Sequence, residues 1–145
     1  MGFVFKLSSI NEEKPAELMT PIVFCIDEDE IAPYTKEYNV LKVNGLLSEK
    51  LLNYQPKKRN LYIIDEFNKI IDNICEPILI KDFEILFDPG FQVDVLKLFI
   101  MTNRKKRIAV LWPGKCRYGK LTFAEPGYPD YKVYKIKDYD ISCVT

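Results

Sequence analysis

The sequence predicts an α/β fold, a mainly parallel sheet flanked by helices with antiparallel strands at its C-terminal edge. Short apolar runs alternate along the chain with segments whose apolar residues recur at the three- and four-residue spacing of a helix. The last third of the chain instead holds short runs separated by turns rich in proline and glycine, which is typical of antiparallel strands. A length of 145 residues is that of a single domain, so one domain is expected over 1–145.

The first half of the chain supplies two strands and two helices. A strand is predicted from Ile22 to Ile26, and it leads directly into four acidic residues. A second strand is expected over 39–43, and a short helix follows around 46–53. Asn60 is a good N-cap because its side chain can accept a hydrogen bond from the first turn of a helix. That helix is predicted to bury one stripe, formed by Leu61, Ile64, Phe67, Ile71 and Ile74.

The second half begins with a strand from Ile78 to Lys81, introduced by Pro77. Asp94 can cap the next helix. A buried strand is expected over 107–112, and short strands over 121–124, 131–136 and 139–144. The apolar residues assigned to the helix after Asp94 are Val95, Leu98, Phe99 and Met101.

Composition excludes several kinds of chemistry. The chain has no histidine, which removes Ser-His and Cys-His nucleophile pairs and His-ligated zinc. The four cysteines form no Cys-x-x-Cys pair, and we expect free thiols, mostly buried, in a reducing compartment. No apolar run is long enough to cross a bilayer and no export signal is visible, so a cytoplasmic location without a membrane partner is expected.

The net charge of zero hides an asymmetry along the chain. Residues 11–37 hold eight acids and two lysines, a balance of −6, whereas residues 101–137 hold ten Lys or Arg and two acids, a balance of +8. Such polarity favours a charged partner or self-association of the opposite ends, and a homo-oligomer is one expectation. The alternative is that the charges are spread over solvated faces.

Five segments of the chain carry a resemblance to a known family: 43–52 (VNGLLSEKLL), 55–61 (QPKKRNL), 79–89 (LIKDFEILFDP), 94–98 (DVLKL) and 121–131 (LTFAEPGYPDY), of which AEPGYPDY is the most specific. Together they resemble the BrxF family, the small P-loop proteins of BREX phage-defence systems. The resemblance covers roughly residues 39–145. It implies a P-loop NTPase-like core and partners among other defence-system proteins, such as the large BREX ATPase.

The chain departs from that family where a nucleotide would bind. A phosphate loop needs glycines, a lysine and a Ser/Thr for Mg²⁺. Residues 27–38 read DEDEIAPYTKEY and contain no glycine, and the eleven residues between Ile26 and Tyr38 predict a truncated or missing phosphate-binding helix. By the resemblance, the metal-holding Asp of the third strand falls on Lys81, and Asp82 beside it points to the other face. The sequence therefore predicts a degenerate core, a pseudo-ATPase with no catalytic residue, no cofactor and no metal.

Acidic and aromatic residues supply the candidate protein-binding sites. Asp27, Glu28, Asp29 and Glu30 follow the first strand, and with Asp82 and Glu84 they offer oxygen ligands for Mg²⁺ or Ca²⁺ as an alternative to a solvated acidic loop. The segment 125–131 (EPGYPDY) is a rigid double turn. It presents Tyr128 and Tyr131 either to a partner or simply as part of the turn.

Basic residues supply an alternative, a DNA-binding site. Lysines and arginines contact phosphates and tyrosines stack on bases, although the same basic residues also suit a helix C-terminus. A further possibility is a reactive Cys116 between Lys115 and Arg117, set against an ordinary loop thiol. The residues assigned to the DNA-binding alternative are Arg104, Lys105, Lys106, Arg107, Lys132, Lys135 and Lys137.

Taken together, these patterns predict a non-catalytic accessory subunit of a bacterial anti-phage system that acts by binding proteins. A DNA-binding accessory domain is the first alternative. A nucleotide hydrolase completed by a partner subunit is the second.

Overall fold

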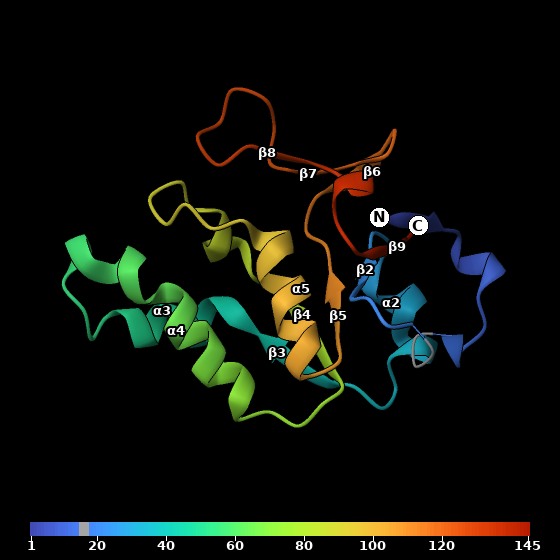
Figure 1. The fold of residues 1–145 in the computed structure, drawn as a ribbon, viewed down its shortest axis with the longest axis horizontal. Coiled ribbons are helices and arrows are strands. Elements are labelled where there is room, and N and C mark those ends of the chain that lie inside the picture. Colours follow the sequence, from blue (N-terminus) through green and yellow to red (C-terminus); the bar gives the residue numbers. More distant parts are fainter. Residues whose placement is uncertain (15–17) are drawn as a thin grey trace.

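A computed structural model describes residues 1–14 and 18–145 and shows an α/β fold with two sheets (Figure 1). Six strands form a parallel sheet in the order β1-β9-β2-β5-β4-β3, and three form an antiparallel sheet in the order β6-β7-β8. This confirms the predicted fold class. The strands are β1 (Phe3–Phe5), β2 (Ile22–Phe24), β3 (Asn39–Lys42), β4 (Ile78–Lys81), β5 (Ile108–Leu111), β6 (Lys115–Arg117), β7 (Lys120–Phe123), β8 (Lys132–Lys135) and β9 (Ser142–Val144). The helices are α2 (Glu28–Ile31), α3 (Val43–Leu51), α4 (Arg59–Asp72) and α5 (Val95–Lys105).

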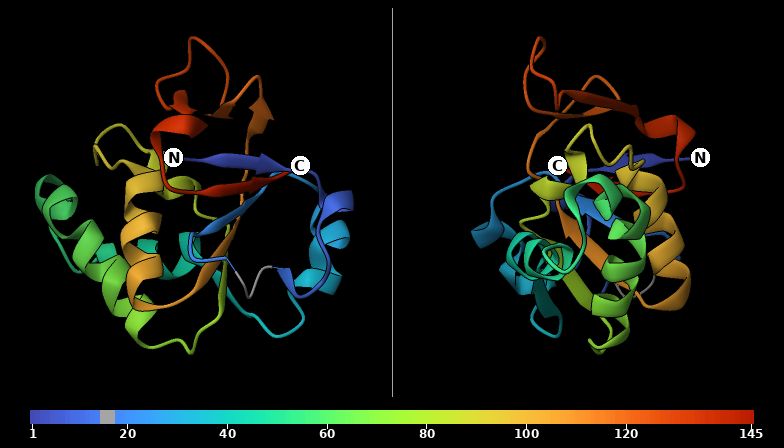
Figure 2. Two further views of the ribbon diagram at one scale, coloured as in Figure 1. Left: turned by 45° about the vertical axis from the view of Figure 1, so that its right-hand side comes forward. Right: turned by 90° about the vertical axis from the view of Figure 1, so that its left-hand side faces the viewer.

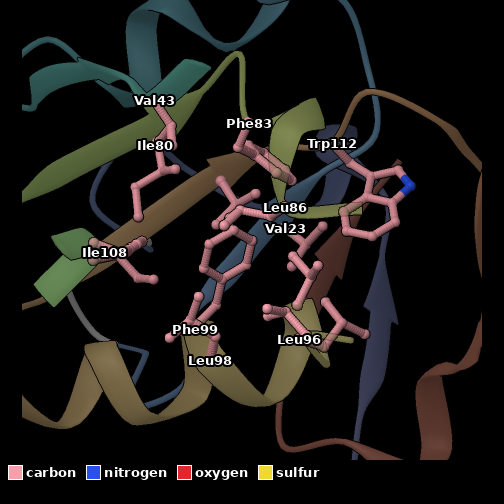
Figure 3. Close-up of a cluster of buried hydrophobic side chains, with 14 of the residues drawn as sticks. Val23, Val43, Ile80, Phe83, Leu86, Leu96, Leu98, Phe99, Ile108 and Trp112 are labelled. Carbon is pink, nitrogen blue, oxygen red and sulfur yellow. The ribbon is translucent and has the colours of Figure 1, made fainter. Parts of the chain in front are cut away.

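Central strands of the parallel sheet are apolar on both faces because both faces are covered. Val23 on β2 points into the larger core, beneath α3, α4 and α5. Its neighbours Ile22 and Phe24 point to the opposite face, where they pack with Ile31 of α2 and with the N-terminal segment. Figure 3 shows the larger core, in which Phe83, Phe99 and Trp112 meet side chains from the strands. This two-sided burial is what a parallel sheet requires.

Helix α4 buries only part of the stripe predicted for it: Phe67 and Ile71 are buried, as predicted. The helix begins at Arg59 with Lys58 as its N-cap, so Asn60 lies inside it and does not cap it. Leu61 and Ile64, assigned to the core, are exposed. The buried residues of α4 are Ile63, Glu66, Phe67, Ile70 and Ile71.

Helix α5 follows the prediction more closely. Asp94 is its N-cap and accepts a hydrogen bond from the backbone N–H of Lys97 at 3.1 Å. Val95, Leu98 and Phe99 are buried, as predicted. Met101 is exposed instead and faces solvent next to α4.

The C-terminal strands lie in two places. β6, β7 and β8 form the antiparallel sheet, which is attached to the larger core by Phe123 stacked on Phe87 with ring centroids 4.0 Å apart. β9, which was grouped with them in the sequence, instead lies in the parallel sheet between β1 and β2. Figure 2 shows β1 and β9 side by side. β1 and β6 were not predicted.

Candidate functional site at the carboxyl edge of the parallel sheet

Ligands of open parallel sheets bind beyond the carboxyl ends of the strands, so this edge is the first place to look for a site. β2 ends at Phe24 and is followed by the predicted acidic segment. That segment forms α2, which is only four residues long and carries Glu28, Asp29 and Glu30 in its first turn. The helix after β2 is therefore a single turn, and its first turn is acidic.

An ion pair at this edge joins α2, which follows β2, to the end of β4. Lys81, the last residue of β4, donates from its Nζ to Glu28 Oε1 at 2.6 Å. The side chain of Lys81 is 15% exposed and that of Glu28 is 52% exposed, so the lysine end of the pair is largely buried. Lys81 occupies the position at which the resemblance implies a metal-holding carboxylate, and its charge is neutralised from within the chain.

The other acidic residues considered as metal ligands have different roles. The Asp82 backbone is left-handed, with a φ of 50°, and its carbonyl accepts a hydrogen bond from the N–H of Asn44 at 2.7 Å. Glu84 Oε2 accepts from Asn44 Nδ2 at 3.1 Å, and Asn44 Oδ1 accepts from the N–H of Ile85 at 2.9 Å. Over residues 1–14 and 18–145, no group of three or more Asp, Glu, Cys or His side chains is placed to hold a metal ion. Asp82 and Glu84 thus fasten the loop after β4 to the start of α3.

The structure separates the basic residues that the sequence grouped together. Arg104 to Arg107 lie at the end of α5 and before β5, at the amino edge of the sheet. Lys106 Nζ donates to the carbonyls of Ile71, Asp72 and Ile74 at 3.0, 3.0 and 2.7 Å. A cation bonded to the last carbonyls of a helix stabilises that helix, so Lys106 has a structural role at the end of α4.

The remaining candidates from the basic and aromatic segments lie in or beside the antiparallel sheet. Lys132 and Lys135 are on β8, and Lys137 is in the short helix Ile136–Asp138 that follows. Tyr128 lies in the turn between β7 and β8, where its side chain is exposed, whereas Tyr131 is half-buried. The carboxyl edge, the end of α5 and the antiparallel sheet are therefore three separate candidate surfaces.

A fourth surface, which sequence reasoning missed, is a groove of about 490 Å³ between α4 and α5. Its apolar wall includes Ile64, Leu98 and Met101, and Leu61 is exposed one turn earlier on the same side of α4. We call this surface the α4–α5 groove. The sequence signal was present as a second apolar stripe on α4, but it was interpreted as core. The cations that border the groove are Lys97, Arg104 and Lys105.

Three of the four cysteines, which are scattered in the sequence, meet in the structure. The thiols of Cys25, Cys116 and Cys143 lie within hydrogen-bonding reach of one another, and Cys75 is exposed elsewhere. Hydrogen bonds from the other two thiols lower the pKa of Cys116. The hydrogen bond with Cys116, together with burial, raises the pKa of Cys143. Cys116 is thus the thiol of this group that favours the thiolate form.

Among the described ranges, no helix combines the length and the apolar character that a membrane crossing demands. Comparisons with protein-family models, with curated proteins and with solved structures find no match to this chain. The resemblance to the BrxF family therefore stays a prediction from the quoted segments alone.

Proposed function

We propose that this chain is a non-catalytic accessory subunit, a pseudo-ATPase of a bacterial anti-phage system that acts by binding other proteins. The observation that carries the non-catalytic part is the Glu28–Lys81 ion pair at the carboxyl edge. The assignment to a defence system rests on the resemblance to the BrxF family. The protein-binding part rests on the α4–α5 groove.

The carboxyl edge is unsuited to a polyphosphate for two physical reasons. Phosphates are bound by backbone N–H groups at the start of a glycine-rich loop and helix, and here the four-residue α2 presents three acids instead. A carboxylate about 4 Å from a phosphate charge costs about 4 kcal/mol at an effective dielectric constant near 20. Lys81, the cation that ends β4 at this edge, is already paired with Glu28. Binding a nucleotide would require breaking that pair and gathering like charges.

The α4–α5 groove has the character of a protein-binding surface. Exposed apolar side chains that line a depression and are bordered by charges mark sites where a partner buries its own apolar residues. The cations Lys97, Arg104 and Lys105 border the groove. Asp94 also lines it, but its carboxylate already accepts hydrogen bonds from the Lys97 N–H and the Tyr139 hydroxyl. Charge complementarity therefore favours an acidic amphipathic segment of the partner, held by an apolar face against Ile64 and Met101.

One co-purification experiment tests the protein-binding part together with the assignment to a defence system. The chain is co-expressed with the large ATPase of the same defence system, and co-purification is compared for wild type, Met101→Glu and Met19→Glu. Met19 is a matched control because it is exposed and lies outside the groove. We expect Met101→Glu to lose the partner and Met19→Glu to retain it. Equal retention by both variants would reject the groove as the binding surface.

The non-catalytic part is measured separately. A site with a Kd of about 10 µM would stabilise the fold by about 2.7 kcal/mol at about 1 mM Mg-ATP. We expect no change in melting temperature with Mg-ATP or Mg-ADP, and no ATP turnover above a Lys81→Ala control. A nucleotide-dependent rise in melting temperature would reject the assignment as a pseudo-ATPase.

A further inference from the structure

The antiparallel sheet has one buried face and one cationic face. Side chains alternate between the faces of a strand. Leu121 on β7 and Tyr134 on β8 point to the larger core and are buried. The residues next to Leu121 and Tyr134 in their strands, and the residues of β6 aligned with these, point to the opposite face and are exposed or half-buried. We call this second surface the cationic face; its members are Lys115, Arg117, Lys120, Thr122, Val133 and Lys135.

Strand register aligns three cations of this face directly opposite one another. Arg117 on β6 pairs with Lys120 on β7, and Lys120 pairs with Lys135 on β8. Directly opposite residues have Cβ atoms about 4.5–5.5 Å apart, and like charges at that separation destabilise a sheet. Repulsion repeated across all three strands indicates a surface that is arranged for an anionic ligand.

Neutralisation from within the chain is slight. Lys115 pairs with Glu125 at 3.4 Å, both side chains being well exposed. Within residues 1–14 and 18–145, no ion pair reaches Arg117, Lys120 or Lys135. Residues 115–137 hold six Lys or Arg against Glu125 and Asp130, a balance of +4, and both acids lie in the turn between β7 and β8.

Exposed aromatic side chains lie in the turns that precede and follow β7. Tyr118 is in the turn between β6 and β7 and is 97% exposed. Tyr128 is in the turn at the other end of β7 and is 64% exposed. The four residues of β7 between these turns span about 13 Å at about 3.3 Å per residue. A hollow of about 350 Å³ adjoins the Tyr118 end, and it is lined by Gly2, Val4, Tyr118, Lys120, Lys135 and Lys137.

We propose that the cationic face binds single-stranded nucleic acid. Arg117, Lys120 and Lys135 contact backbone phosphates, and Tyr118 stacks on an unpaired base beside the hollow. Exposed aromatic side chains beside cations on a sheet are the arrangement with which proteins hold single strands. Stacking on Tyr118 requires a base free of its complement, which favours a single strand over a duplex. An acidic protein surface would gain from the cations but would leave Tyr118 without a stacking partner.

The test is fluorescence anisotropy of a labelled oligo-dT of about 15 nucleotides, longer than the strip, titrated with the full chain at several salt concentrations. Three phosphate contacts predict a slope of log K against log salt of about −2. We expect the triple variant Arg117→Gln, Lys120→Gln, Lys135→Gln to abolish binding.

The matched control removes the same charge elsewhere on the molecule. Lys50, Lys57 and Lys58 are exposed near the end of α3 and the start of α4, and all three are changed to Gln. This variant should bind as wild type does, and circular dichroism verifies the fold of both triple variants.

A second variant tests stacking. Tyr118→Ala should weaken oligo-dT binding about 5- to 150-fold while leaving the salt slope unchanged, because base stacking on an aromatic is worth about 1–3 kcal/mol. Absence of oligo-dT binding at low salt would overturn the proposal, as would equal losses in the two triple variants. Equal affinity for duplex and single strand would overturn it too. Binding to phosphatidylserine vesicles without oligonucleotide binding would assign the face to a membrane surface instead.

Discussion

Removing either partner of the Glu28–Lys81 ion pair should lower the free energy of unfolding, and the distance and burial of the pair determine by how much. The Nζ of Lys81 and the Oε1 of Glu28 are 2.6 Å apart, and the centres of charge are further apart, at about 4 Å. With an effective dielectric constant of about 20 to 40, the Coulomb attraction is about 2 to 4 kcal/mol. Desolvation of Lys81 and the half-exposed position of Glu28 offset part of this. We expect a coupling free energy of about 1 to 2 kcal/mol, above the range of exposed pairs.

A double-mutant cycle measures that coupling. Urea unfolding is followed for wild type, Glu28→Gln, Lys81→Met and the double variant at constant pH. A loss of 1 to 2 kcal/mol corresponds to about 3 to 6 °C in melting temperature for a chain of this size. The exposed Lys36–Glu12 pair, at 4.0 Å, is the matched control and should show a coupling near zero.

The reasoning fails if the two pairs give the same coupling. A value for Glu28–Lys81 below about 0.3 kcal/mol would mean that the lysine is solvated like an ordinary surface cation. Lys81 would then be available to a phosphate. The main physical argument against nucleotide binding would be lost with it.

Three further predictions concern the rest of the molecule. Asp94→Ala should cost about 1 to 2 kcal/mol in the free energy of unfolding, measured with urea, because it removes the N-cap of α5 and the acceptor of the Tyr139 hydroxyl. A loss below about 0.3 kcal/mol would contradict the cap. Burial raises the pKa of Tyr134 to about 12, whereas the pKa in the unfolded chain is 10. The stability that the neutral Tyr134 hydroxyl contributes is therefore present below pH 10 and should be lost as the pH rises from 10 to about 12. Tyr134→Phe should flatten this part of the curve of unfolding free energy against pH. An identical profile for the variant would refute that assignment. Near pH 6, iodoacetamide should alkylate Cys116 faster than the more exposed Cys75, because thiol hydrogen bonds lower the pKa of Cys116. Mass spectrometry measures the two rates, and faster alkylation of Cys75 would contradict the prediction.

Local signals predicted the parts of the fold that local interactions determine. The strand Ile78–Lys81 and the Asp94 cap were located at their residues because apolar runs and capping side chains act over a few positions. Helix α4 carries two possible apolar stripes, and the sequence alone could not choose between them. The structure buries the stripe that includes Glu66, whose carboxylate accepts a hydrogen bond from the Tyr54 hydroxyl at 2.6 Å. That bond to a residue outside the helix makes the burial of an acid possible, and helical periodicity does not contain it.

The sequence predicted individual residues of the candidate site but not the contacts between them. The acidic residues after β2 and the lysine ending β4 were both identified from the sequence, but their pairing across the sheet edge was not. The cysteine group and the aligned cations of Arg117, Lys120 and Lys135 were also missed, because strand register and tertiary packing create them. Side chains from distant segments become neighbours only once the topology is known.

The position of β9 imposes an order on assembly. β1 pairs with β9 in the sheet, with Phe3 opposite Ser142. On its other side β9 pairs with β2. β1 therefore has no strand to pair with until β9, which comes last in the sequence, has joined the sheet. This long-range pairing makes the sheet edge slower to fold than the helical side of the molecule. Cutting the chain just before Ser142 should release both ends together, so that protection from hydrogen exchange of the Leu7 N–H, which donates to the Thr145 carbonyl at 2.9 Å, reports whether the C-terminal segment is in place.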